Sequence, residues 1–312
     1  MIQFSDFFFP STDGKSQIHV NKWEPTEGPK KAVVQIAHGV AEYGKRYEDF
    51  AMFLAKHGYV VVANDHLGHG QSLVDNSPMV YFGEKDSWWY PVDDVEKLRN
   101  MTHQAYPDLP YYLFGHSMGS FISRSHLIRY KGNLDGCIIC GTGFLNGFMV
   151  KGGKIIANRE IKKYGRKGYS NLADKLAFGG YNKAFKPNRT EFDWLSVNEE
   201  NVDAYIEDPL CGGRTTLGLF RDLLEGISYV NNKTNIRSMN KEQPILFISG
   251  DKDPVGEMGK GVRKAYNEFK AAGIKDVDIK LYEGLRHEIL NEKEHQMIYD
   301  DVLAWLDAHV IG

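Results

Sequence analysis

The chain has 312 residues, enough for two domains or for one large α/β domain with an insertion. Hydrophobic residues make up 42% and charged residues 25%, which excludes a chain disordered by composition. Lys and Arg number 38 against 41 Asp and Glu, so there is no general positive charge to bind phosphates and we expect no nucleic-acid partner.

The three cysteines are too few for a disulfide framework, which favours a reducing compartment. Cys137 and Cys140 lie in an apolar run that predicts a strand. Positions three apart on a strand face opposite sides, so we expect two buried thiols rather than a redox or metal pair. The first ten residues lack a basic region and a cleavage site, and the longest uncharged stretch, 136–150, is too short to span a bilayer. We expect a cytoplasmic protein without metal or cofactor.

The first half of the chain predicts alternating strands and helices. Residues 4–9 and 17–23 form a hairpin around the turn pair Asp13-Gly14. After it come, in chain order, a strand at 32–37, a helix at 47–57, a strand at 59–63, a helix at 92–106, a strand at 111–114, a helix at 119–130 and a strand at 134–140. Because these strands are almost continuously apolar, we expect a mostly parallel sheet with helices on both faces.

The alternation then stops, and residues 146–235 contain no convincing strand. Residues 151–190 carry eleven Lys and Arg against two acidic residues, whereas 191–208 carry seven acidic residues and no Lys or Arg. Strands resume at 244–249 and 277–282, and a helix at 298–310 closes the chain. The sequence therefore predicts an α/β core made of residues 1–145 and 236–312, with a helical cap, residues 146–235, inserted into it.

The strongest chemical signal is a G-x-S-x-G motif at 115–119, between a predicted strand and a predicted helix. A serine on such a tight turn takes a strained backbone that points its hydroxyl away from the sheet, and Gly115 and Gly119 leave room for the turn. The five residues alone would also suit an ordinary glycine-rich turn. The strand and helix around them favour Ser117 as a nucleophile.

A nucleophilic serine needs a base and a third group that orients the base. Candidates follow the two later strands: Asp251 and Asp253 come after 244–249, and His287 comes after 277–282. Both positions lie just beyond the carboxyl ends of predicted parallel strands, where α/β sheets bind their ligands. The order serine, acid, histidine suits a hydrolase, and the spacing leaves both aspartates open as the acid.

Three other motifs have simpler explanations. His287 begins a sequence like the zinc motif H-E-x-x-H, but Asn291 stands in the last place, which disfavours a metalloprotease. His66 and His69 lie near glycine turns, and we expect them to hydrogen-bond their loop rather than to catalyse or bind metal. The glycine-rich residues 141–147 miss the dinucleotide-binding pattern by one position and indicate a bend.

Acyl transfer also needs donors for the developing oxyanion. The backbone N–H of Met118, the residue after the nucleophile, is one candidate. The second is the N–H of Val40, because His38-Gly39 follows the strand at 32–37 and Gly39 allows the backbone to turn. An ordinary turn remains the alternative for His38-Gly39 taken alone.

Five motifs in this order resemble the monoacylglycerol lipase and lysophospholipase branch of the α/β hydrolases. They are HGVAEYGKRY (38–47), DHLGHGQS (65–72), GHSMG (115–119), GDKD (250–253) and YEGLRH (282–287). Ala41 and Ser120 stand where the family commonly has glycine, and both are small enough to leave catalysis intact.

The resemblance implies an α/β-hydrolase fold with Ser117 as nucleophile, Asp253 rather than Asp251 as the acid, and His287 as the base. Val40 and Met118 would supply the oxyanion donors, and the cap would cover an acyl-chain tunnel. We therefore expect a serine esterase that cleaves monoacylglycerols or lysophospholipids through an acyl-enzyme. A serine aminopeptidase of the proline iminopeptidase kind, an esterase for small non-lipid esters and a non-enzymatic binding protein remain alternatives.

The cap leaves two further questions open. Its apolar residues could line a tunnel or pack the cap itself; they are Phe144, Leu145, Phe148, Met149, Phe178, Phe185 and Phe192. The basic segment 151–190 could make transient contact with an anionic membrane surface, or form a solvated face balanced by the acidic residues 191–208. The sequence does not determine the oligomeric state.

Overall fold

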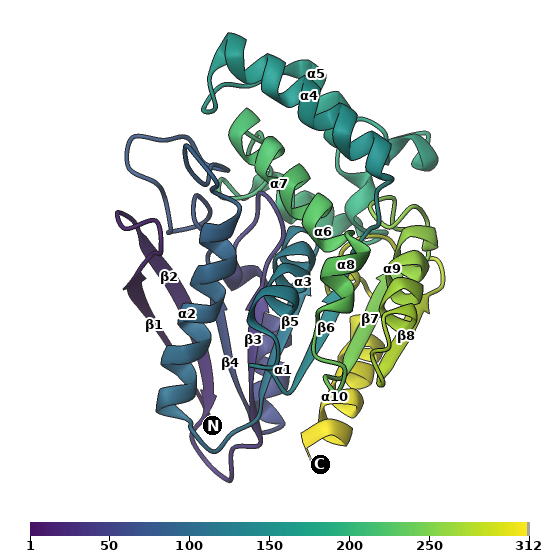
Figure 1. The fold of residues 1–312 in the computed structure, drawn as a ribbon. Helices are drawn as coiled ribbons and strands as arrows, with labels where there is room; N and C mark the ends of the chain where they lie inside the picture. Colours follow the sequence, from purple (N-terminus) through teal and green to yellow (C-terminus); the bar gives the residue numbers. More distant parts are fainter. Residues whose placement is uncertain (311–312) are drawn as a thin grey trace.

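An eight-stranded sheet runs through the centre of the molecule in the computed structural model, which describes residues 1–310 (Figure 1). The strand order is β1-β2-β4-β3-β5-β6-β7-β8. The strands are β1 (Ile2–Pro10), β2 (Gln17–Pro25), β3 (Ala32–Ala37), β4 (Tyr59–Asn64), β5 (Tyr111–His116), β6 (Gly136–Cys140), β7 (Ile245–Gly250) and β8 (Val277–Tyr282). The hairpin β1–β2 is antiparallel and joins β4 in antiparallel fashion, while β3 to β8 pair in parallel.

Helices cover both faces of the sheet, as predicted. They are α1 (Glu48–Lys56), α2 (Trp89–Ala105), α3 (Met118–Tyr130), α9 (Lys260–Ala271) and α10 (His295–Val310). One hydrophobic cluster lies under α2, α3 and α9, and a second lies under α1 and α10. Cys137 belongs to the first cluster and Cys140 to the second, so the two thiols face opposite sides of β6. Burial raises the pKa of both thiols, and the prediction of buried core cysteines is confirmed.

The chain between β6 and β7, all of which is described, forms helices and no strands. These helices are α4 (Gly147–Tyr164), α5 (Asn171–Ala177), α6 (Glu199–Glu207), α7 (Leu217–Val230) and α8 (Lys233–Arg237), with short 3₁₀ turns such as η3 (Asp193–Leu195). In Figure 1, α4 to α7 gather over one end of the sheet, and the two chain termini lie toward the other end. This helical content agrees with an insertion, while the domain boundaries at 145 and 235 stay a prediction.

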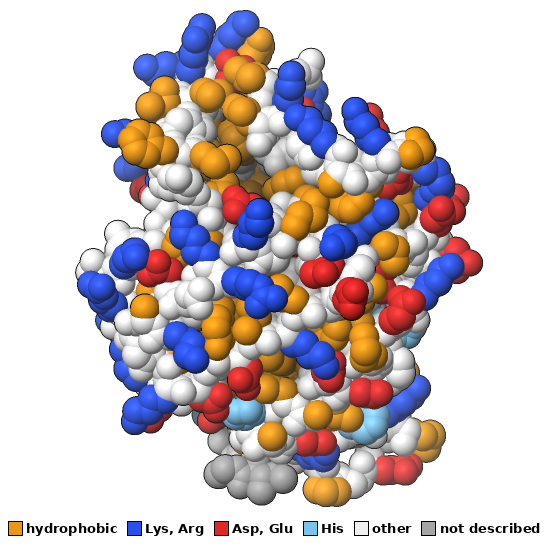
Figure 2. All heavy atoms as spheres, turned by 90° about the vertical axis from the view of Figure 1, so that its right-hand side faces the viewer, with side chains coloured by type: hydrophobic (Ala, Val, Ile, Leu, Met, Phe, Trp, Pro, Cys, Tyr) orange, Lys and Arg blue, Asp and Glu red, His pale blue; other side chains and the backbone are white. Residues whose placement is uncertain are grey.

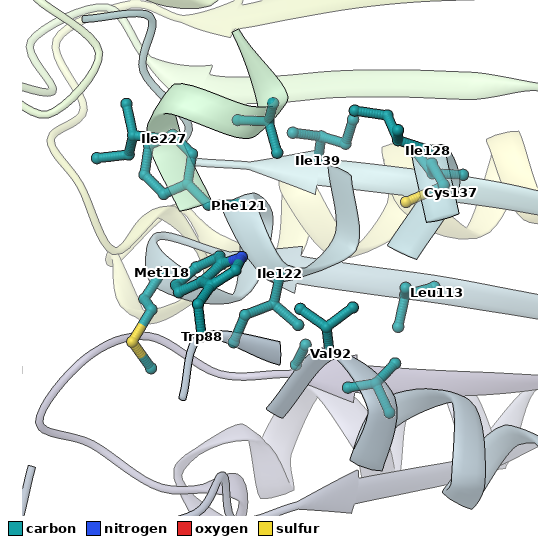
Figure 3. Close-up of a cluster of buried hydrophobic side chains, with 14 of the residues drawn as sticks. Trp88, Val92, Leu113, Met118, Phe121, Ile122, Ile128, Cys137, Ile139 and Ile227 are labelled. Atoms are coloured by element: carbon teal, nitrogen blue, oxygen red, sulfur yellow. The ribbon is translucent and has the colours of Figure 1, made fainter. Parts of the chain in front are cut away.

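Helix α7 is built into the main core. Figure 3 draws its residue Ile227 together with Phe121 of α3 and with Trp88, all in one buried cluster. A Cβ on Gly226 would lie 2.1 Å from the Trp88 ring, so only glycine lets α7 approach this closely. Packing against α3 therefore fixes α7 relative to the residues that follow β5.

Helices α4 and α5 lie further out. They expose large apolar side chains, among them Phe148 (88% exposed), Met149, Ile155, Leu172 and Leu176. Figure 2 shows hydrophobic and basic side chains interspersed at the top of the molecule, where these helices lie. Within residues 1–310, no helix combines the length and the apolar character needed to cross a bilayer.

Candidate active site

Ser117 occupies a strained turn between β5 and α3. Its backbone has φ 53° and ψ −118°, a conformation that a residue with a side chain rarely adopts. A Cβ on Gly115 would lie 2.2 Å from Ser123 Oγ, and one on Gly119 would lie 2.0 Å from the carbonyl oxygen of Ala37. Both neighbouring glycines are therefore required by close packing, which supports the interpretation of the motif as a nucleophile turn.

His287 and Asp253 form a buried pair. His287 Nδ1 lies 2.9 Å from Asp253 Oδ2, and both side chains are almost fully buried. Asp253 also accepts hydrogen bonds from the Ser249 hydroxyl and from the Val255 N–H, which fix its carboxylate. Asp251 instead accepts a hydrogen bond from the Gly284 N–H. The structure thus brings Asp253, and not Asp251, against His287.

The electrostatics of this pair suit a general base. Burial alone lowers the pKa of His287, but the Asp253 carboxylate raises it, and the net shift is upward from the usual 6.5. Because Asp253 takes Nδ1, Nε2 is the ring nitrogen left to accept a proton. His116 stacks on His287 with ring centroids 4.6 Å apart, and burial lowers its pKa to about 4, so it stays neutral.

A cavity of about 610 Å³ opens beside these residues. Ser117 and His287 line it together with Gly39 and Val40, which follow β3. Met118 directly follows Ser117 and begins α3, so its N–H has no acceptor within the helix. The residues predicted from separate motifs therefore converge at the carboxyl ends of β3, β5, β7 and β8.

The rest of the cavity wall comes mainly from the chain between β6 and β7. Its apolar members are Phe178, Phe192, Trp194, Leu195 and Tyr205, and its polar ones are Asp174, Lys175, Asn182, Glu191, Arg214 and Thr215. The seven apolar residues proposed for a tunnel separate into three groups: Phe178 and Phe192 line the cavity; Phe144, Leu145 and Phe185 pack against other side chains; and Phe148 and Met149 are exposed. Packing and exposure therefore account for most of them.

A buried ion network at the cavity wall was missed by the sequence analysis. Glu42 accepts hydrogen bonds from the Gly39 N–H, the Tyr47 hydroxyl and Arg46. Arg46 also binds both carboxylate oxygens of Glu288 at 2.8 and 2.9 Å. Burial alone would raise the pKa of Glu288, but the Arg46 guanidinium lowers it to about 2. One arginine thus ties the loop that carries Val40 to the residue after His287.

The signal for this network was present but weak. Glu42 and Arg46 stand four residues apart, a spacing that suits an ion pair on one helical turn, and both lie in the first family motif. Glu288 lies 242 positions beyond Arg46, and nothing in the local pattern joins the two.

The segment 193–198 is held against the loop that carries His287. The Glu288 N–H donates to Leu195 O at 2.7 Å, and Arg286 donates to the carbonyl oxygens of Asp193 and Ser196. From the other side, the buried Glu292 carboxylate accepts hydrogen bonds from the Ser196 hydroxyl and from the N–H groups of Val197 and Asn198. This part of the cap region is joined to the base loop, residues 286–292, along its length.

The histidines at 66 and 69 lie behind the loop that carries Val40. The His66 N–H donates to His38 Nε2 at 2.8 Å, while His38 Nδ1 lies 2.7 Å from Gly39 O, which sets the tautomer of His38. His69 Nδ1 lies 3.1 Å from Leu67 O. Burial lowers the pKa of His38 to about 4 and that of His69 to about 3, so both stay neutral. Their hydrogen bonds fit the expected structural role.

Comparisons with known proteins agree with the geometry. Residues 28–294 match the family model described as serine aminopeptidase, S33. A monoglyceride lipase homolog of monkeypox virus is 36% identical over 93% of this chain and 94% of its own, and a monoacylglycerol lipase of Mycolicibacterium smegmatis is 29% identical over 95% of each. A thermostable carboxyl esterase from Bacillus coagulans, solved with glycerol, has a TM-score of 0.91, with 27% identity over 98% of this chain and 99% of its own. The chain belongs to the S33 serine aminopeptidase family and, within it, to the monoacylglycerol lipase-like branch of the α/β hydrolases, whose members include carboxylic ester hydrolases.

Proposed function

We propose that the protein hydrolyses carboxylic esters of lipids, of the monoacylglycerol or lysophospholipid type, through an acyl-enzyme on Ser117. The observation that carries the proposal is the buried Asp253–His287 pair at 2.9 Å, whose histidine lines the same cavity as a serine on a strained turn. A serine, an acid and a histidine in this chain order are the three groups that nucleophilic catalysis by serine needs.

In the proposed reaction, His287 Nε2 removes the proton from Ser117 Oγ, and Oγ attacks the ester carbonyl carbon. The N–H groups of Val40 and Met118 stabilise the oxyanion; loss of one such donor typically lowers the rate by about 10²–10³. The C–O bond to the alcohol then breaks, and the alcohol leaves with the proton from His287. Water attacks the acyl-enzyme, with His287 as base again, and releases the carboxylic acid and free Ser117.

Lipid esters suit the cavity because its wall is partly apolar and partly polar. The rings of Phe178, Phe192 and Trp194 offer contact to an acyl chain, and the polar groups offer partners to a head group. The names of the two relatives described above as lipases also support a lipid ester as substrate. An aminopeptidase would need an acidic group for the substrate's amino end. In the wall, Asp174 is paired with Arg214 at 2.7 Å, and Glu42 and Glu288 are paired with Arg46, which leaves Glu191 as the acidic group that an aminopeptidase could use.

Hydrolysis rates over a substrate panel test this proposal. The panel contains monoacylglycerols of graded chain length, a lysophospholipid, a short water-soluble ester and a proline amide, each assayed with the wild type and with Ser117→Ala. We expect the highest kcat/KM on a monoacylglycerol or lysophospholipid and no turnover in the variant. Preference for the proline amide would establish the aminopeptidase instead, and preference for the short ester would establish a small-ester esterase.

We also propose a cytoplasmic enzyme that touches membrane surfaces transiently through α4 and α5. Support comes from the free thiols of Cys137, Cys140 and Cys211, and from exposed Phe148 and Met149, which lie just before the basic segment 151–190. Co-sedimentation with phosphatidylcholine vesicles, with and without an anionic lipid, tests the surface contact. Equal binding to both vesicles, or none to either, would contradict an electrostatic contribution.

A further inference from the structure

The base of the proposed reaction has an aromatic neighbour from the cap region. Trp194, in η3, lies against His287 with ring centroids 5.2 Å apart and an angle of 39° between the ring planes. Tyr181 packs on Trp194 at 4.9 Å, and His116 packs on His287 at 4.6 Å. His287 thus contacts two aromatic rings, and Trp194 also forms part of the cavity wall.

The position of Trp194 is fixed by the hydrogen bonds that join 193–198 to the base loop. Leu195, next in the chain, accepts from the Glu288 N–H, and Asp193, on the other side, accepts from Arg286. The two chain neighbours of Trp194 are therefore hydrogen-bonded to the two chain neighbours of His287. The segments that carry the imidazole and the indole are thus joined by hydrogen bonds on both sides of the ring contact.

Charged groups face His287 from several elements. The Asp253 carboxylate approaches from the loop after β7, Glu42 from the loop after β3, and Glu288 lies next in the chain. Arg46 offsets the two glutamates by pairing with both, and His116 behind the ring is neutral. An indole within about 6 Å of a cation adds to the attraction through the negative face of its ring.

We propose that Trp194 is a positioning residue for the base: it holds His287 in the orientation that binds Asp253 and stabilises the imidazolium formed when Ser117 loses its proton. This inference rests on the proposed function, because it assigns a partner to the proposed base. Trp194 acts through His287 and takes part in no bond-making step. A purely structural role, as a member of the small cluster with Leu195 and Tyr205, would affect stability alone.

The test compares Trp194→Leu, which keeps apolar bulk but loses the ring, with Trp194→Phe, which keeps an aromatic face. Trp305→Leu is the matched control, because Trp305 is as buried as Trp194 but lies on α10 against Tyr112. The readouts are the midpoint of the acidic limb of kcat/KM on a soluble ester and the pKa of His287 from NMR titration of its imidazole.

Loss of the indole removes a contribution that favours the charged ring, so the pKa of His287 should fall. We expect Trp194→Leu to lower both midpoints by about 0.4–1 unit, Trp194→Phe to restore most of the difference, and Trp305→Leu to leave both unchanged. Unchanged midpoints in Trp194→Leu, or the same fall in Trp305→Leu, would overturn the inference. The NMR titration needs no turnover, so a wild type without hydrolase activity would refute the proposed function and still leave Trp194 tested.

Discussion

Two parts of the chain between β6 and β7 contrast sharply. The inner segment, residues 193–208, is hydrogen-bonded to the base loop and lies against Arg46, whose guanidinium is 4.9 Å from the Tyr205 ring. The outer helices, α4 and α5, pack on each other and on α7 and expose large apolar side chains. A segment between β6 and β7 is therefore not close to the site merely because it belongs to this helical region. The inner segment forms part of the proposed active site. Of the two outer helices, α5 reaches the cavity wall with Asp174 and Lys175, whereas α4 contributes no residue to it.

The largest expected effect comes from breaking the buried ion network beneath the inner segment. Arg46→Met leaves Glu42 and Glu288 buried without their cation, and we expect the free energy of unfolding to fall by about 3–5 kcal/mol. Urea unfolding monitored by tryptophan fluorescence measures it. The control is Arg189→Met, which removes an exposed pair with Asp203 and should leave the free energy of unfolding close to that of the wild type. Equal losses of unfolding free energy in the two variants would contradict the expected difference between a buried and an exposed ion pair.

A smaller effect is expected from the junction between the inner segment and the base loop. Glu292→Gln places an amide where the carboxylate accepts several hydrogen bonds, and we expect a loss of about 1–3 kcal/mol in unfolding free energy. Because the loop carries His287, kcat should also fall by about 10-fold to 100-fold. Glu200→Gln, which changes an exposed side chain of α6, is the control and should match the wild type. A destabilised Glu292 variant with unchanged kcat would show that the junction does not position the base.

The pH dependence of activity tests the role of His287, which the inner segment contacts. His287 must be neutral to act as base, and its raised pKa keeps it protonated to a higher pH than an ordinary imidazole. Activity should therefore rise through a midpoint above 6.5. The measurement is kcat/KM on a soluble ester from pH 5 to 9. A rate that is flat from pH 5 to 8, or a midpoint below 6.5, would contradict the proposed base.

The smallest effect is expected on the outer helices. Phe148→Ser changes a side chain that is 88% exposed, so the free energy of unfolding should stay within about 0.5 kcal/mol of the wild type. Hydrolysis of a soluble ester should be unchanged, while binding to anionic vesicles should weaken. Phe144→Ser, four residues earlier and buried, should instead cost about 3–5 kcal/mol. Thermal unfolding of the two variants side by side decides whether exposure explains the difference.

The sequence predicts the core well because its signals are local. Residues 111–114 are an apolar run, residues 32–37 are apolar except for Gln35, and the structure has strands at both places. The glycines around Ser117 signal their turn directly. Helix α9 was not assigned, although its buried residues Val262, Ala265 and Phe269 recur at helical spacing.

The site is less accessible from sequence where contacts join distant residues. The residues alone left Asp251 and Asp253 equivalent, and only the family resemblance separated them before the distance to His287 did. The contact of Trp194 with His287 and that of Arg46 with Glu288 depend on how the loops after β3 and β8 and the inner segment fold together. No local pattern carries that information, because neither partner is near the other in the chain.

The most direct test of the proposed nucleophile is labelling with a fluorophosphonate, followed by intact-mass measurement and peptide mapping. We predict a single adduct on Ser117 in the wild type, none in Ser117→Ala, and much slower labelling in His287→Ala, which keeps the serine but lacks its base. An adduct on another residue, or labelling of His287→Ala at the wild-type rate, would contradict the proposal that Asp253 and His287 activate Ser117.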